Sequence, residues 1–328
     1  MAVVRGAGEV LPAAWAAGEI AVIGLGKSGR AVAALLRRAG ARVYASDAGV
    51  SPAVAETATA LEAAGASVDV GRHDLDRIRR ASLVVASPGV SPTAPALVAA
   101  RDAGVTVVGE VEIALRFLPH ARYVAITGTN GKTTTTAISG ALLSALGLRA
   151  VTAGNIGTPL ADLPLRDEPP EWIALEMSSF QLHDTPSIAP AVGVLTNLSP
   201  NHLDRYASLD EYYADKALLF RNAGPRSRWV SNADDPDSRK LVAGVPGAHR
   251  TFSVSGPADA YLDRTADRLV VLGEPLMPRR EFPLLGDHNV ANALAAALAV
   301  MVADERHATR AARRAIAGAL LAFRALEH

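Results

Sequence analysis

The sequence predicts an α/β protein with mostly parallel sheets, because three features recur along it. Short apolar runs of strand type alternate with alanine- and leucine-rich stretches of helical type. Two of these runs enter glycine-rich turns that open a helix, at residues 24–29 and 128–131. The length of 328 residues favours two domains over one core. We therefore expect two α/β domains, each with one glycine-rich loop at the carboxyl edge of its sheet.

The composition restricts the class of protein. Apolar residues make up 49% and charged residues 20% of the chain, as in ordinary globular proteins. Lys and Arg number 33, as do Asp and Glu, so no net charge favours nucleic acid or an anionic membrane as a partner. The lack of cysteine excludes disulfides, thiolate metal sites and a cysteine nucleophile. We see no secretion signal or bilayer-spanning apolar run, and expect a cytoplasmic monomer.

The first domain is predicted to open with a strand, a glycine-rich loop and a helix. Residues 19–23 have a buried-strand pattern, Gly24, Gly26 and Gly29 match GxGxxG, and residues 30–39 are helical in type. A second strand over 42–46 ends at Asp47. Glycines at this spacing, followed by an acid about 20 positions on, are typical of dinucleotide-binding βαβ units. Alone the pattern indicates NAD, although Asp47 can also be a polar residue that closes a strand.

Two further strands are expected in this domain. Residues 83–86 run into the turn Ser87-Pro88-Gly89, and a strand from residue 105 ends in the acidic segment Gly-Glu-Val-Glu. An ordinary turn also explains the Ser-Pro-Gly sequence. Because loops after successive parallel strands gather at one edge of a sheet, their side chains can face a single ligand. The candidates are Lys27, Ser28, Asp47 and Ser87.

The second glycine-rich loop indicates a nucleoside-triphosphate site. A strand over 123–127 enters TGTNGKTTT, and a helix continues to about Leu146. Backbone N–H groups and a helix N-terminus then surround one point where an anion is favoured. Lys132 can reach the outer phosphates, and the Thr133 hydroxyl can hold Mg²⁺. Ile126 stands where the general P-loop has glycine, and a loop that only joins strand to helix is the alternative.

Polar residues also follow three later strands of the second domain. Strands over 150–153, 172–179 and 191–197 carry or precede Asn155, Glu176 and His202. Parallel strands would place these side chains at the same sheet edge as the phosphate loop.

Two later segments have both a structural and a ligand-binding interpretation. Lys216 lies in a helix predicted over 209–222, where a lysine is usually a solvated surface residue. Asn289 and Asn292 are three residues apart, on one helical face, and can present amides to an adenine or ribose edge. Simple N-capping by Asp287 or Asn289 explains that segment as well.

Together the motifs resemble those of the Mur ligases. TGTNGKTTT is similar to the ATP loop of that family and of its folylpolyglutamate synthase relatives. GLGKSG, the acid after the second strand, ASPGVSP and GEVEIA resemble the uridine-nucleotide domain of the branch that adds D-glutamate. The resemblance implies a Rossmann-like uridine-nucleotide domain over 1–109 and a P-loop-type ATPase domain over 110–323. Residues 324–328 would begin the hinge to a third, amino-acid-binding domain that is absent, so we expect substrate binding without turnover.

The activity implied by the resemblance is amide-bond formation during cytoplasmic peptidoglycan precursor synthesis. ATP would phosphorylate UDP-N-acetylmuramoyl-L-alanine, and D-glutamate would displace phosphate from the acyl phosphate. ATP and two Mg²⁺ ions are implied, the first ion held by Thr133 and Glu176. The second would be held by His202 and by Lys216, which is carbamylated in the family. The catalytic residues would be Lys132, Glu176, His202 and Lys216.

The resemblance assigns the remaining site residues to the two nucleotides. The residues implied to bind ATP are Gly128, Thr129, Asn130, Gly131, Lys132, Thr133, Thr134, Asn289 and Asn292. The residues implied to bind the uridine-nucleotide substrate are Gly26, Lys27, Ser28, Asp47, Ser87, Gly89, Asn155, Ser178 and His202.

Three other functions stay open from the sequence. A folylpolyglutamate synthase shares the ATP loop but has no use for a Rossmann-like domain before it. An NAD-dependent oxidoreductase explains GxGxxG and leaves the phosphate loop unexplained. A non-catalytic nucleotide-binding protein would keep both sites without turnover.

Overall fold

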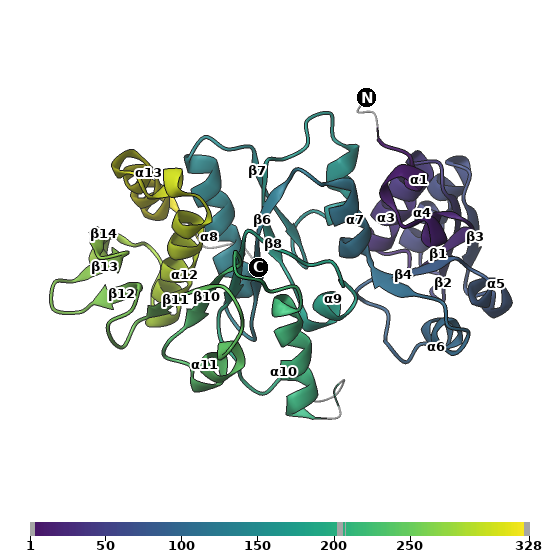
Figure 1. Cartoon of the computed structure of the whole chain (residues 1–328). Helices are drawn as coiled ribbons and strands as arrows, with labels where there is room; N and C mark the ends of the chain where they lie inside the picture. The colour runs from purple at the N-terminus through teal and green to yellow at the C-terminus, as the bar shows by residue number, and fades with distance from the viewer. Residues whose placement is uncertain (1–3, 202–205, 207, 325–328) are drawn as a thin grey trace. The chain divides into compact units, whose positions relative to one another are not determined.

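The computed structural model describes residues 4–201, 206 and 208–324, which form two compact units (Figure 1). The first unit comprises Met1–His120 together with Thr158–Pro169 and His183–Ser187. The second comprises Ala121–Gly157, Pro170–Leu182 and Ile188–His328. Two short segments from later in the chain thus belong to the first unit. His202 lies outside the described residues.

The first unit is built on a parallel sheet in the order β3-β2-β1-β4-β5. The order reverses between β1 and β4, which is the switch point where doubly wound sheets hold ligands at their carboxyl edge. The strands are β1 (Glu19–Ile23), β2 (Arg42–Asp47), β3 (Ser67–Val70), β4 (Leu83–Ala86) and β5 (Val107–Gly109). The helices are α1 (Ala7–Val10), α2 (Ala13–Ala16), α3 (Lys27–Arg38), α4 (Pro52–Ala63), α5 (Leu75–Arg79), α6 (Pro95–Asp102) and α7 (Glu110–Phe117), with a 3₁₀ helix η1 (Leu160–Leu165).

The second unit has a longer sheet in the order β14-β13-β12-β11-β10-β9-β6-β8-β7. Strands β6 to β12 pair in parallel, whereas β13 pairs antiparallel with both β12 and β14. The strands are β6 (Arg122–Thr127), β7 (Ala150–Gly154), β8 (Trp172–Glu176), β9 (Val192–Leu195), β10 (Arg228–Asn232), β11 (Ala248–Ser253), β12 (Ala260–Asp263), β13 (Arg268–Val271) and β14 (Glu274–Pro278). The predicted α/β fold with mostly parallel sheets is confirmed.

Two helices carry the core of this unit. They are α8 (Lys132–Ala145) and α12 (Asp287–Ala303), which lie side by side in Figure 1. From Ala293 to Met301 every residue of α12 is at most 1% exposed, because small alanines let the helix pack closely on both α8 and the sheet. The remaining helices are α9 (Ser179–His183), α10 (Leu209–Ala217), η2 (Leu218–Phe220), α11 (Pro236–Val242), η3 (Arg279–Glu281), η4 (Glu305–Ala308) and α13 (Arg310–Ala322).

Several element boundaries differ from the sequence expectation; the strand predicted over 172–179, for example, ends at Glu176, and α9 begins at Ser179. The acidic segment after residue 108 does not extend strand β5 but forms the first turn of α7. Carboxylates in the first turn of a helix interact favourably with the helix dipole. The helix predicted over 209–222 ends at Ala217 and tightens into η2.

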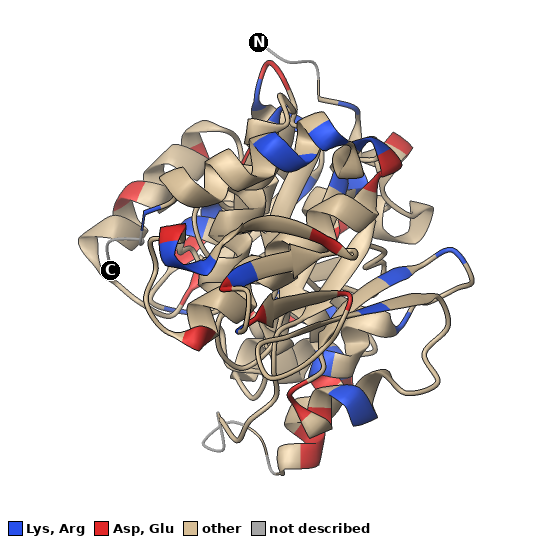
Figure 2. Cartoon of the chain, turned by 90° about the vertical axis from the view of Figure 1, so that its left-hand side faces the viewer, with Lys and Arg blue, Asp and Glu red and all other residues tan. Residues whose placement is uncertain are grey.

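Figure 2 shows segments bearing Lys and Arg interspersed with segments bearing Asp and Glu. Within the ranges that the structure describes, no helix combines the length and the apolar character needed to cross a bilayer.

Two buried glutamates of α7 hold the later segments in the first unit. Glu112 Oε2 accepts hydrogen bonds from the backbone N–H of Ser187 at 2.9 Å and from its hydroxyl at 2.7 Å. Glu110 Oε1 accepts from the N–H of Ala161 in η1, whereas its Oε2 has no hydrogen-bond partner among the described residues. Burial raises the pKa of Glu110 to about 7. The fold therefore favours the neutral form of this carboxyl.

The pH dependence of stability tests this assignment. Between the ordinary glutamate pKa and about 7, the native state keeps the Glu110 proton that the unfolded chain has released, so stability falls as pH rises. Glu110→Gln cannot ionise. Its free energy of unfolding relative to wild type should improve by up to about 3 kcal/mol between pH ~5 and pH ~7.5, measured by urea denaturation.

The exposed Glu62→Gln variant is the matched control and should show no such change with pH. A difference between Glu110→Gln and wild type that is the same at both pH values would contradict the assignment.

Candidate functional site

The loop between β6 and α8 requires glycine at two positions. Gly128 has a φ of 146° and Gly131 a φ of 78°, and side chains disfavour both conformations. A Cβ at Gly128 would collide with Thr196 Oγ1, and one at Gly131 would collide with Asn292 Oδ1. The glycines therefore allow the loop to lie close against the end of β9 and the start of α12.

Residues that follow β9 hold the loop in place. Thr196 Oγ1 donates to the carbonyl oxygen of Asn130 at 2.7 Å. The Asn197 side chain accepts from Asn130 N–H and donates to Asn130 C=O, each at 2.9 Å, while its main-chain oxygen accepts from Thr129 N–H at 2.9 Å. Thr196 and Asn197 were not among the site residues predicted from the sequence. Both residues directly follow β9, which pairs with β6, the strand that leads into the loop. That position at the carboxyl edge of the sheet could have identified them.

Two lysines converge on this loop. Lys132 Nζ donates to the carbonyl oxygens of Gly128 at 3.0 Å and Thr129 at 2.8 Å. Lys216 Nζ donates to the same Gly128 oxygen at 2.7 Å, and Lys216 is only 1% exposed. The interpretation of Lys216 as a solvated surface residue is therefore wrong.

Burial changes the acidity of both amines. It lowers the pKa of Lys132, which the negative charge of Glu176 partly opposes. It lowers the pKa of Lys216 to about 7, and the positive charge of Lys132 adds to the effect. Burial and the neighbouring positive charge therefore both favour the uncharged form of the Lys216 amine.

Glu176 supplies the negative charge of the site. It ends β8 and is 1% exposed, and its Oε1 accepts from Asn155 Nδ2 at 2.8 Å. Its Oε2 is buried and has no hydrogen-bond partner within the described part of the chain. An unpartnered buried carboxylate oxygen suits a hard cation such as Mg²⁺.

The described side chains would supply only some of the ligands that a bound Mg²⁺ ion needs. Thr133, in the first turn of α8, adds a hydroxyl of the kind that P-loops use. Among residues 4–201, 206 and 208–324, no group of three or more His, Asp or Glu side chains could hold a metal ion. Mg²⁺ held by Glu176 and Thr133 would therefore take its other ligands from water and from substrate phosphates, as Mg²⁺ commonly does.

The two asparagines of α12 have different surroundings. Asn292 is 7% exposed, and its Oδ1 accepts from the Thr135 hydroxyl of α8 at 3.2 Å. Asn289 Nδ2 donates to Leu285 C=O at 2.8 Å. The residue that caps α12 is Gly286, without a side-chain cap, so N-capping by Asp287 or Asn289 is not what the structure shows.

In the first unit, Asp47 and Ser87 shape the glycine-rich loop that follows β1. Asp47 accepts from Leu25 N–H at 2.6 Å through Oδ2 and from Gly49 N–H at 2.7 Å through Oδ1. Ser87 Oγ donates to Gly24 C=O at 2.8 Å. A Cβ at Gly29 would collide with that same carbonyl, so the third glycine lets α3 pack on the loop.

The structure thus gathers part of the predicted set in each unit. In the second unit Gly128 to Thr134, Asn155, Glu176 and Lys216 lie around one sheet edge. Ser178 lies just beyond β8 and is bonded to Gln181. In the first unit Gly26 and Lys27, at the start of α3, are exposed, as is Gly89, and Ser28 is half-buried. Their roles as ligands remain predictions.

Known domain families match both parts of the chain. Residues 18–109 match the Mur ligase MurD-like N-terminal domain, and residues 126–300 match the Mur ligase middle domain.

Curated relatives extend over almost all of the chain. A protein of Frankia casuarinae named "UDP-N-acetylmuramoylalanine--D-glutamate ligase" is 41% identical over 96% of this chain and 66% of its own length. A protein of the same name from Acidobacterium capsulatum is 39% identical over 94% of this chain and 67% of its own length. The chain spans about two thirds of the length of the curated relatives it matches.

Solved structures share the fold at lower identity. UDP-N-acetylmuramate:L-alanyl-gamma-D-glutamyl-meso-diaminopimelate ligase from Neisseria meningitides is 22% identical with a TM-score of 0.63, covering 95% of this chain and 99% of that one. UDP-N-acetylmuramate-alanine ligase from Thermotoga maritima is 23% identical with a TM-score of 0.56, covering 94% and 69%. The resemblance seen in the motifs is confirmed, and the chain belongs to the Mur ligase family.

Proposed function

We propose that this protein is an ATP-dependent ligase that joins D-glutamate to UDP-N-acetylmuramoyl-L-alanine in cytoplasmic peptidoglycan precursor synthesis. The observation that carries the proposal is the meeting of Lys132, Lys216 and Glu176 around the loop that opens α8. The names of the relatives supply the substrates. We further propose a monomer with domains over 1–109 and 110–323 and a hinge segment over 324–328.

The chemistry requires activation of a carboxylate. One carboxylate oxygen of the muramoyl substrate attacks the γ-phosphorus of ATP, ADP leaves, and an acyl phosphate forms. The amine of D-glutamate then attacks the acyl carbon, phosphate leaves, and the nitrogen loses a proton. Such steps depend on positioning and charge neutralisation more than on a protein nucleophile.

Residues of the second unit would provide this positioning and charge neutralisation. Lys132 and the N–H groups at the start of α8 would hold the β- and γ-phosphates. Thr133 and Glu176 would hold one Mg²⁺, and His202 with modified Lys216 would hold a second; bound Mg²⁺ neutralises the charge of the reacting oxyanions. The remaining ATP contacts would be Gly128, Thr129, Asn130, Gly131, Thr134, Asn289 and Asn292. The muramoyl nucleotide would contact Gly26, Lys27, Ser28, Asp47, Ser87, Gly89, Asn155, Ser178 and His202.

We also propose that Lys216 is carbamylated, and its surroundings support this modification. CO₂ reacts with a neutral amine: a C–N bond forms, the nitrogen loses a proton, and the product is an anionic carbamate. The burial of Lys216 and its proximity to Lys132 both favour replacing an ammonium by an anion. The modified side chain would offer carboxylate-like oxygens to Mg²⁺.

Calorimetric titration with UDP-N-acetylmuramoyl-L-alanine, with NAD in parallel, tests the proposed ligand of the first unit. We expect saturable binding of the uridine nucleotide and none of NAD. Binding of NAD instead would mean that the GxGxxG pattern marks a dinucleotide site and would overturn the proposal for this unit.

Lys132→Ala tests the phosphate loop. Loss of a charged hydrogen-bond donor to phosphate should weaken Mg²⁺–ATP binding about tenfold or more, because such bonds contribute about 1.5–3 kcal/mol. Titration of the muramoyl nucleotide should be nearly unchanged. The exposed Lys240→Ala variant is the control and should bind both ligands as wild type does. Loss of both ligands in Lys132→Ala would argue against the assignment.

Lys216 carbamylation can be observed directly. In ¹³C NMR with ¹³C-bicarbonate, a carbamate signal should grow as pH rises through about 7, since the neutral amine is the reactive form. Lys216→Arg keeps the positive charge but cannot form the carbamate, and should lack the signal. A signal that persists in Lys216→Arg would assign the carbamate to another amine.

A further inference from the structure

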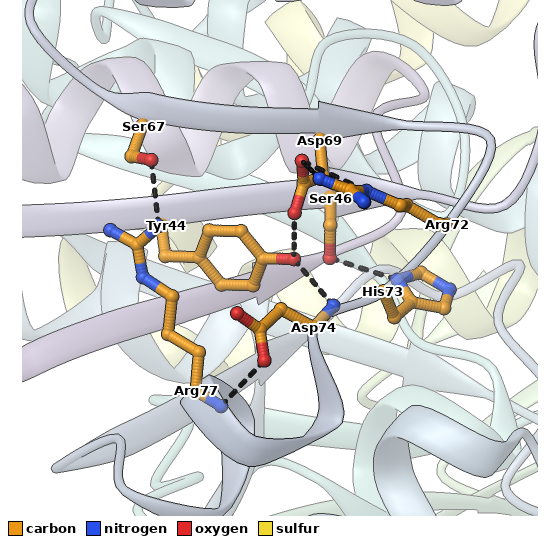
Figure 3. A network of polar contacts seen from close by, with 8 residues as sticks. All are labelled: Tyr44, Ser46, Ser67, Asp69, Arg72, His73, Asp74 and Arg77. Atoms are coloured by element: carbon orange, nitrogen blue, oxygen red, sulfur yellow. Dashed lines mark hydrogen bonds and ion pairs between the residues drawn. The ribbon is translucent and has the colours of Figure 1, made fainter.

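A polar network joins the carboxyl ends of β2 and β3 in the first unit (Figure 3). The buried hydroxyl of Tyr44 donates to Asp69 Oδ2 at 3.0 Å and accepts from the N–H of Asp74 at 2.9 Å. The Arg77 guanidinium lies 4.4 Å from the centroid of the Tyr44 ring and pairs with Glu19 at 2.6 Å. These groups satisfy one another and fix the loop that follows β3.

His73 differs from the rest of this network. Its Nδ1 lies 2.8 Å from Ser46 Oγ, which belongs to β2 and is fully buried. Its Nε2 has no hydrogen bond to the residues that the structure describes, and in Figure 3 this edge of the ring points away from Ser46. The ring is half-buried, and burial lowers its pKa against the opposing charges of Asp47 and Asp69. The network therefore presents a neutral imidazole with one ring nitrogen held and the other open.

The loop that carries His73 is tied to the glycine-rich loop through Asp47. The Asp47 carboxylate accepts from Leu25 N–H in the loop after β1, and its main-chain oxygen accepts from Gly71 N–H after β3 at 2.8 Å. Three successive loops at one sheet edge are thus linked through a single residue. Strands lie about 4.8 Å apart, so the loops after β1 and β3 are about 10 Å apart, a distance that a ribose with its base can cover.

An exposed apolar side chain lies beside this path. Val50, in the loop after β2, is 75% exposed, and its Cγ1 would lie 3.0 Å from a Cβ at Gly71. A valine this exposed gains little from the fold, but it can pack against the face of a planar base. The apolar side chain of Val50 and the available Nε2 of His73 therefore lie in the neighbouring loops that follow β2 and β3.

We propose that His73 Nε2 and Val50 recognise the base of the nucleotide whose phosphates lie at the first glycine-rich loop. This inference rests on the proposed function, which places a uridine nucleotide there. A phosphate at the N-terminus of α3 leaves the ribose near Asp47 and the base towards β3, as in other βαβ nucleotide sites. One imidazole nitrogen then pairs with a polar edge of the pyrimidine, and Ser46 fixes the ring that makes the contact. His73 would be a specificity-determining residue.

Titration of the full chain with UDP and CDP tests the inference, because the two bases present opposite donors and acceptors at one edge. Wild type should bind UDP more tightly than CDP. His73→Ala should weaken UDP binding about tenfold and reduce the preference over CDP, because one hydrogen bond to the base is lost. Glu62→Gln, an exposed substitution on α4 outside this network, is the control and should leave the UDP-to-CDP ratio unchanged.

NMR of the His73 imidazole, assigned with His73→Gln, provides a readout that a structural role would not move. Its signals should shift when UDP is added to wild type. Equal UDP affinity in wild type and His73→Ala, with unmoved His73 signals, would overturn this inference and leave the proposed function standing. Absence of UDP binding to wild type would overturn the proposed ligand of the first unit and this inference with it.

Discussion

Two buried amines share one carbonyl oxygen, and the second unit is arranged around that contact. Lys132 and Lys216 both donate to Gly128, while Glu176 is the carboxylate whose charge acts on Lys132. The charge of Asp215 favours the protonated form of Lys216, but burial and the positive charge of Lys132 outweigh it and lower the pKa of the amine. An anion brought to the site would offset the positive charge of the two lysines. A site of this kind suits phosphate binding, and it also suits conversion of Lys216 to a carbamate.

Both units hold their glycine-rich loops by the same physical means. A loop with positive φ values has little stability of its own, so a residue at the end of a neighbouring strand must satisfy its backbone groups. Asn197 does this for the phosphate loop by bonding the N–H and C=O of Asn130. Asp47 does it for the first loop through Leu25. Asp47 thus serves loop geometry, whichever nucleotide the loop binds.

Local sequence was sufficient to predict the strands and loops that carry the site. Apolar runs, glycines at strand-to-helix junctions and polar residues at strand ends all depend on a few neighbouring residues. The position of Lys216 was not predictable in this way. Its helix is polar enough to be a surface helix, and its burial depends on contact with Gly128, 88 positions earlier in the chain. The β13–β14 hairpin was also missed; its turn at Leu272 and Gly273, both with positive φ, was a weak signal.

The division into two compact units shows the same limit more strongly. The acidic segment after residue 108 was predicted to end a strand, but Glu110 and Glu112 begin α7 and bind segments 51 and 75 positions later in the chain. Nothing in residues 158–169 or 183–187 indicates that they pack with the first unit, because each is anchored through a backbone N–H, which every residue but proline has. The buried carboxylates that accept these hydrogen bonds therefore determine where the two segments pack. Burying such a carboxylate costs free energy, as Glu110 shows. One oxygen of that side chain is satisfied, the other is not, and the raised pKa of the group results from its burial.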